Sequence, residues 1–281
     1  MRALIGFLMS LGLVGSVQAL SIYDPELSRC DSYAVKAESQ LITAQILKCP
    51  VQGLRWNNDV KGQSQWCAGV RPEITVNETK ARANELLTCM KAPVAANEAD
   101  LKLEPYQLGE ATIRAIQADQ LSRVKQLIAA GADVRFEGSW GNDGRMLYVA
   151  ISNAADKTTR FLISWKHFSP NASPNAGPSP LGKLLQKRPV NYELLESLLQ
   201  NGADPNYIGE LTHVGYLPLV IAIQNKDEKA IDLLIKYKAK VNLDEGLIWD
   251  AGNILDIAMK SSTPKIVNLL KQAGAVSKPR L

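Results

Sequence analysis

A unit of about 36 residues recurs between Glu104 and Ala275, and this repeat constrains the fold more than any other feature of the sequence. Each copy carries two apolar runs at helical spacing, the second rich in paired leucines, and ends on a short turn sequence. That turn reads Gly-Ala-Asp at 131–133 and again at 202–204. One helix pair of this kind cannot bury its apolar face alone, so neighbouring copies must stack on one another. We therefore predict an all-α chain whose larger part is a stack of about five helix-turn-helix units.

The copies differ in regularity. The clearest segments of the regular copies are 115–134, 193–206, 217–242 and 254–275. The remaining copy, the second along the chain, has 147–151 and 161–163 in register, but Lys-His-Phe at 166–168 replaces the expected glycine turn. A loop rich in Pro, Asn and Ser follows over 169–180. The sequence therefore predicts the least regular packing in the second unit.

This pattern resembles the ankyrin repeat, whose signature combines a Thr-Pro-Leu-like helix start, a pair of small residues, a Val-x-Leu-Leu run and a terminal Gly-Ala-Asp-x-Asn. Gly131 and Gly202 suit a helix end that needs a positive φ, and small alanines let two antiparallel helices approach each other. Asp133 and Asp204 can then brace the turn that follows. The resemblance covers about 104–275 and implies an ankyrin-repeat solenoid that binds a protein partner through an extended surface.

All four cysteines lie in the first third of the chain, at Cys30, Cys49, Cys67 and Cys89. A zinc site is the alternative to disulfides, but no histidine lies near them in sequence and no CxxC pair is present. An even number of cysteines in an exported chain is typical of disulfide bonds. We therefore predict two disulfides within an N-terminal helical hairpin.

Two helices are predicted around these cysteines. Asp-Pro at 24–25 is a helix-start signal, and apolar residues at helical spacing continue to about Lys48. The segment 52–69 contains Gly and Asn residues typical of turns and is interpreted as a loop or a short irregular piece. A second helix with a weaker pattern is predicted over 73–90 or 77–90.

Helix geometry restricts how the cysteines can pair. With a rise of about 1.5 Å per residue, Cys30 and Cys49 lie much further apart than the roughly 7 Å that a disulfide allows between Cα atoms. The same holds for Cys67 and Cys89 across the second helix. In an antiparallel hairpin the start of one helix meets the end of the other, so the predicted pairs are Cys30–Cys89 and Cys49–Cys67.

Residues 1–19 have the features of a secretory signal peptide. Arg2 precedes an apolar run over 3–17 that is too short to span a bilayer, and Val-Gln-Ala at 17–19 provides a cleavage site. No cysteine stands directly after that site, where a lipid anchor would be attached, so we expect an exported, periplasmic protein without a membrane anchor. The expected domains are a signal peptide over 1–19, a four-Cys helical domain over 20–92, a linker over 93–104 and a repeat domain over 105–281.

Charge and motifs argue against several classes of function. The 32 basic and 28 acidic residues are interspersed, whereas a nucleic-acid-binding face needs clustered Lys and Arg. Only His167 and His213 could serve as a histidine base, and they fall in two different loops without a nucleophile motif. Phosphate-binding glycine loops and metal-ligand spacings are absent from the sequence. We therefore expect no nucleic-acid partner, no enzymatic activity, and neither a cofactor nor a metal.

The resemblance implies that the loops between repeats project from the stack and contact the partner. These loops carry aromatic side chains, which dominate binding hot spots, together with carboxylates. The residues predicted to bind the partner are Phe136, Trp140, Phe168, Tyr207, His213, Tyr216, Asp244, Glu245, Trp249 and Asp250. The alternative for any single ring is that it packs on a neighbouring loop.

Two functions fit an exported repeat protein of this kind. In the first, the chain resembles periplasmic ankyrin-type proteins that act as immunity proteins, inhibiting a toxic effector enzyme. In the second, it resembles periplasmic ankyrin proteins that serve as a scaffold or a stress-response accessory. Fold alone does not identify the partner, so both remain open from the sequence.

Overall fold

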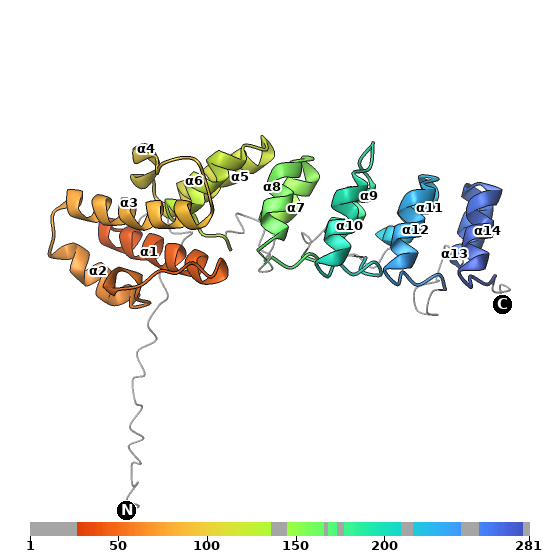
Figure 1. The fold of residues 1–281 in the computed structure, drawn as a ribbon, viewed down its shortest axis with the longest axis horizontal. Helices are drawn as coiled ribbons and strands as arrows, with labels where there is room; N and C mark the ends of the chain where they lie inside the picture. The colour runs from red at the N-terminus through yellow and green to blue at the C-terminus, as the bar shows by residue number, and fades with distance from the viewer. Residues whose placement is uncertain are drawn as a thin grey trace, which may run out of the picture.

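A computed structural model describes residues 27–135, 145–165, 168–172, 177–208, 216–242 and 253–277. Within these ranges the regular structure consists of fourteen α-helices and one short 3-10 helix, with no strand. The all-α class predicted from the sequence is therefore confirmed. Figure 1 shows a compact group of helices at the N-terminal end, followed by helix pairs arranged in a row.

The N-terminal group contains three α-helices where a hairpin of two was predicted. These are α1 (Arg29–Ile46), α2 (Val60–Ala68) and α3 (Pro72–Cys89), with the 3-10 helix η1 (Leu54–Trp56) between α1 and α2. Helix α2 and η1 occupy the segment interpreted as a loop. The signal at 24–25 does not begin α1, because residues 27 and 28 are not helical and the Ser28 side chain caps the helix by accepting from the Asp31 N–H. We call residues 29–90 the four-Cys unit.

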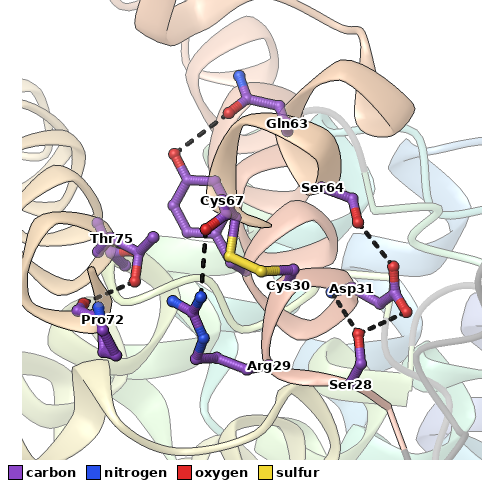
Figure 2. Close-up of a disulfide and its surroundings, with 11 residues drawn as sticks. Ser28, Arg29, Cys30, Asp31, Gln63, Ser64, Cys67, Pro72 and Thr75 are labelled. Carbon is purple, nitrogen blue, oxygen red and sulfur yellow. Dashed lines mark hydrogen bonds between the residues drawn. A yellow bond between two sulfur atoms is a disulfide. The ribbon is translucent and has the colours of Figure 1, made fainter. Parts of the chain in front are cut away.

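The extra helix changes the disulfide pairing. The bonds are Cys30–Cys67 (Figure 2) and Cys49–Cys89, with Cα–Cα distances of 5.4 Å and 5.7 Å, so the predicted connectivity is wrong. Because α2 turns the chain back, its C-terminal end brings Cys67 to the start of α1. Helix α3 then runs in the same direction as α1, and the ends of these two helices bring Cys49 to Cys89.

The segment 93–104, predicted as a linker, is packed against the rest of the chain. It contains the short helix α4 (Glu98–Leu101), in which Asp100 and Leu101 are each 2% exposed. Asp100 forms an ion pair with Arg123 of α6. The four-Cys unit and the helices that follow are therefore joined by an ordered connection instead of a loose one.

Five helix pairs follow in the described part of the chain, and we call them the helix stack. Their bounds are α5 (Pro105–Gln117) with α6 (Leu121–Ala129), α7 (Arg145–Ser152) with α8 (Asp156–Ile163), α9 (Pro180–Leu185) with α10 (Tyr192–Gln200), α11 (Pro218–Gln224) with α12 (Glu228–Lys236), and α13 (Ile254–Ser261) with α14 (Pro264–Gln272). The first helices of successive pairs contact one another, as do the second helices from α6 to α12. The pairs thus form two layers, and one apolar core runs through both and into the four-Cys unit.

The turns that end the second helices behave as the sequence predicts. Gly131 and Gly202 have φ of 109° and 92°, the left-handed conformation that glycine adopts without strain. The carboxylates of Asp133 and Asp204 each accept a hydrogen bond from the backbone N–H two residues later, at 2.8 Å. Gly131 has a second role, because a Cβ there would lie 2.9 Å from the side chain of Lys36 in α1.

Polar contacts dock the four-Cys unit onto the first helix pair. The Gln40 side-chain amide donates to the Ala129 carbonyl at 2.7 Å, and helices α1 and α3 pack on α6. The Lys36 ammonium donates to the carbonyls of Leu101 and Leu103, at 3.0 Å and 3.1 Å. The unit thus covers the end of the stack that lies opposite α14, where a terminal repeat needs its outermost apolar face shielded.

Candidate functional site

Most residues predicted to bind a partner lie outside the described residues. This applies to Phe136, Trp140, His213, Asp244, Glu245, Trp249 and Asp250. Their predicted role therefore stays a prediction. The structure does describe Phe168, Tyr207 and Tyr216, and it separates them into two groups.

Phe168 belongs to the core. Its side chain is 7% exposed, and its ring stacks on Trp165 with centroids 5.9 Å apart. Trp165 in turn meets the ring of Phe161 edge-on at 4.9 Å. An aromatic residue after the second helix of a pair can thus fill space between units, and most of the Phe168 side chain is buried here. Its predicted role in binding a partner stays a prediction.

Tyr207 and Tyr216 are both partly exposed and lie on either side of the connection between α10 and α11. Tyr207 directly follows Asn206, and its backbone N–H bonds to the Asp204 carbonyl at 3.1 Å. Tyr216 lies two residues before Pro218, the first residue of α11. Of the predicted binding residues, these two are the ones that the described structure places at the edge of the stack, on the same connection.

A recurring asparagine fixes how successive connections lie. Asn206 donates from its amide to the Lys238 carbonyl at 3.2 Å and accepts from the Lys240 N–H at 2.7 Å. Asn171 and Asn242 make the same two bonds to the turn of the following unit. We call each of these residues an asparagine clamp. Because the clamps recur at equivalent positions in three consecutive units, they hold the connections at a regular spacing along the stack.

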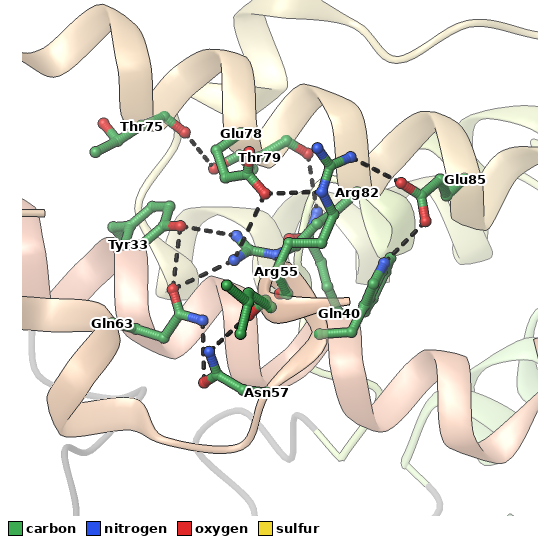
Figure 3. Close-up of polar contacts among 12 residues, drawn as sticks. Tyr33, Gln40, Arg55, Asn57, Gln63, Thr75, Glu78, Thr79, Arg82 and Glu85 are labelled. Atoms are coloured by element: carbon green, nitrogen blue, oxygen red, sulfur yellow. Dashed lines mark hydrogen bonds and ion pairs between the residues drawn. The ribbon is translucent and has the colours of Figure 1, made fainter. Parts of the chain in front are cut away.

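A buried arginine organises the interior of the four-Cys unit (Figure 3). Arg82 is 1% exposed, and its guanidinium donates to the Arg55 carbonyl at 2.8 Å, to the Tyr33 hydroxyl at 3.0 Å and to the Gln63 amide oxygen at 3.3 Å. Glu78 lies 4.0 Å from the same guanidinium and also pairs with Arg55 at 3.1 Å. Burial raises the pKa of Tyr33, while the nearby Arg82 charge opposes that rise.

A cavity of about 620 Å³ opens above this network. Arg82 and Tyr33 lie at its base, and Leu54 and Trp66 lie at its rim with exposed fractions of 91% and 41%. The Trp66 ring packs on Tyr33 with centroids 5.5 Å apart. This arrangement offers apolar contact area beside polar groups that are already hydrogen-bonded, which suits binding better than proton transfer.

Few features of the sequence indicate this surface. Trp66 was visible as an aromatic residue, but it fell in a segment interpreted as a loop, and arginine is ordinarily an exposed residue. The asparagine clamps are easier to recognise in the sequence, since Asn206 and Asn242 occupy the same position in two copies of the repeat. Both histidines, His167 and His213, lie outside the described residues.

Two further findings bear on the kind of site. In the ranges that the structure describes, no three His, Cys, Asp or Glu side chains lie together in a way that could hold a metal ion. None of the helices described has the length and apolar character needed to cross a membrane. Comparison with protein-family models finds no match, and comparison with curated proteins also finds none.

Proposed function

We propose that this chain is an exported ankyrin-type repeat protein that acts by binding another protein, as an immunity protein or inhibitor of a toxic effector enzyme. The two disulfides support export, because such bonds persist in oxidising compartments such as the periplasm. The ankyrin-type assignment is supported by the paired helices in two layers and by the left-handed turns at Gly131 and Gly202.

The asparagine clamps carry the proposal. They hold the ends of three consecutive units in the same geometry, so the connections that follow begin from equally spaced anchor points. Long segments carrying Trp249, His213 and acidic residues start close to these anchors. A rigid scaffold that carries variable loops is the arrangement by which many proteins present a binding surface.

The composition of the segments between helix pairs favours inhibition of the bound partner. In the sequence, the aromatic residue Trp249 directly precedes Asp250 and lies five residues after Asp244. Aromatic residues provide the buried anchors of tight interfaces, and carboxylates match a cationic active-site cleft. Together they suit a surface that blocks an enzyme's cleft.

The test is affinity capture with the mature, oxidised protein from the envelope and secreted fractions of the source cells, followed by mass spectrometry. We expect one enzyme to be retained in stoichiometric amount and to lose activity in the complex. As a control, the Tyr207→Ala/Tyr216→Ala variant should retain less of it, whereas Tyr106→Ala, on α5, should capture as much as the wild type. Capture of a partner that keeps full activity would refute inhibition.

A periplasmic scaffold or stress-response accessory is the second candidate. One observation favours it: Leu54 and Trp66 provide an apolar surface on the four-Cys unit that is separate from the connections of the stack. A scaffold needs two surfaces in order to hold two proteins at once. Simultaneous capture of two proteins, one of which is lost in a Leu54→Ser/Trp66→Ser variant, would support this candidate over inhibition.

A further inference from the structure

A second cavity, of about 710 Å³, lies where the four-Cys unit meets the helix stack. Its walls come from the ends of α1, α3 and α8 and from α6. We call it the junction cavity. Three of its lining residues are lysines, Lys48, Lys91 and Lys125, and none of the described lining residues is acidic. Its volume is within the range of pockets that hold a small ligand or a few residues of a peptide.

The three lysines reach the junction cavity from different elements. Lys48 and Lys91 are exposed and follow the last turns of α1 and α3, with φ of 53° and 48°. Lys125 comes from α6, donates to the Met90 carbonyl at 2.8 Å, and lies 5.0 Å from the centre of the Phe161 ring. Burial lowers the pKa of Lys125, so its ammonium is held in a place that disfavours positive charge.

These ammonium groups have no carboxylate partner within the described residues. Elsewhere on the surface several lysines do: Lys236 pairs with Glu196 at 2.7 Å, and Lys80 pairs with Glu98 at 2.6 Å. A cluster of unpaired cations around a cavity repels itself, and an anion placed among them would relieve that repulsion. The charge of the junction cavity therefore favours an anionic occupant.

The partial negative charges at helix C-termini do not neutralise the three lysines of the junction cavity. Lysines are favourable near helix C-termini, and three such ends, those of α1, α3 and α8, surround the junction cavity. Each end carries roughly half a negative charge, so three ends offset only about half of three ammonium charges. Lys125, moreover, projects from the body of α6 instead of its end. A net positive potential is therefore left in the cavity.

Aromatic rings form the apolar part of the junction cavity. Phe161 and Trp165 meet edge-on at 4.9 Å, and Trp165 is 6% exposed, so the pair is held in place by the core. Phe161 is partly exposed and adds apolar surface to the cavity, which the apolar side chains and backbone of a peptide can contact and a small inorganic anion cannot. The lining thus suits a peptide that places carboxylates on the lysines and apolar atoms on the rings.

We propose that the junction cavity binds an acidic peptide segment of the partner protein, with its carboxylates on Lys48, Lys91 and Lys125 and its apolar atoms against Phe161. This inference deepens the proposed function, on which it depends for the existence of a protein partner. It places part of the binding surface at the contact between the two regions of the chain, in addition to the connections of the stack.

The test uses the full oxidised protein and a fluorescently labelled poly-glutamate peptide, with binding followed by anisotropy at low salt. We expect poly-glutamate to bind and poly-glutamine of the same length not to bind. Lys48→Gln/Lys91→Gln, which leaves the Lys125 hydrogen bond intact, should weaken binding by about twofold to thirtyfold. The matched control is Lys226→Gln/Lys260→Gln, which removes the same charge at exposed sites outside the cavity and should leave the affinity unchanged.

Three results would overturn the inference. The first is no binding of poly-glutamate, and the second is equal weakening by the control variant, which would show attraction to the net charge alone. The third is displacement of the peptide by succinate at the same carboxylate concentration, which would assign the cavity to a free small anion. If the peptide fails to bind but affinity capture still retains an enzyme, the proposed function stands and only the junction cavity loses its role.

Discussion

The four-Cys unit and the helix stack are held together in different ways, although one apolar core runs through both. In the stack, contacts recur from unit to unit: left-handed turns at Gly131, Gly202 and Gly274, asparagine clamps in three consecutive units, and two layers of contacting helices. In the four-Cys unit no contact repeats. Two disulfides and a hydrogen-bonded network around one buried arginine hold three helices, two of 18 residues and one of 9.

Because the two regions are stabilised differently, substitutions in them should have different effects on stability. Stability in a stack of similar units is approximately a sum of unit and nearest-neighbour terms, so local changes should have local and additive effects. A network that shares one buried guanidinium should instead fail as a whole, because its members depend on the same group. The two regions can therefore be told apart by the size and additivity of mutational effects.

Loss of the disulfides should have the largest effect. The bonds join cysteines 37 and 40 residues apart, for which the chain-entropy model gives about 4 kcal/mol each. We expect reduction to unfold the four-Cys unit while α13 and α14 keep their protection from hydrogen exchange. The Cys30→Ser/Cys67→Ser and Cys49→Ser/Cys89→Ser variants separate the two contributions in urea denaturation. Equal loss of protection throughout the chain would contradict the contrast between the two regions.

Substitution of Arg82 comes next in size. Arg82→Ala removes one hydrogen-bond partner each from the Tyr33 hydroxyl and the Gln63 amide oxygen and leaves the Arg55 carbonyl without its Arg82 donor, which should cost about 3–5 kcal/mol. Arg82→Lys keeps the charge but cannot reach the same acceptors, so it should recover only a small part of this loss. The measurement is chemical denaturation, with exposed Arg71→Ala as the control. A loss below about 1 kcal/mol would show that the network is not what holds the unit together.

The asparagine clamps should show smaller and additive effects. Asn206→Ala removes two hydrogen bonds and should cost about 1–2 kcal/mol, and Asn242→Ala should cost a similar amount. Because the two clamps share no partner, the double variant should lose the sum of the single losses to within about 0.5 kcal/mol. Asn206→Asp keeps the acceptor for the Lys240 N–H but loses the amide donor. Its free energy of unfolding should therefore lie between those of the wild type and of Asn206→Ala. Strong non-additivity would argue against independent units.

The smallest expected effect is a pH dependence of the contact between the two regions. Burial lowers the pKa of Lys36 from its ordinary value of 10.5, and the nearby Glu104 charge opposes this only in part. Between the lowered pKa and 10.5 the unfolded chain binds the proton that the folded chain has released, so stability rises with pH across that window. In Lys36→Met this rise should be missing, whereas the alkaline titration of Tyr33 is common to both proteins. Parallel curves of unfolding free energy against pH would contradict this.

The same contrast explains how much of the structure could be predicted from the sequence. In the stack, the repeated sequence made the helix pairs and their turns predictable, because Gly131 and Asp133 could be compared with their counterparts in other units. The four-Cys unit has no internal copy. Helix α2 buries only Gln63 and Cys67 and contains Gly62, so its apolar periodicity is too weak to predict a helix. Without α2, the pairing of Cys67 could not be predicted correctly.

The candidate site shows a similar limit. Phe168 and Tyr207 both follow second helices in the sequence, yet one fills the core and the other lies at the edge of the stack. Phe168 is buried where its ring stacks on Trp165, and this contact depends on the tertiary structure. The junction cavity depends on contacts between residues as distant in sequence as Lys48 and Phe161. No local pattern could place them together.

The most direct test of this account is hydrogen exchange on a chain that begins at residue 91 and so lacks the four-Cys unit. If that unit caps the stack, α5 and α6 should lose protection first, because the apolar face that they bury against α1 and α3 becomes exposed, while α13 and α14 stay protected. A soluble shortened chain in which α5 and α6 exchange as slowly as in the full protein would contradict the cap.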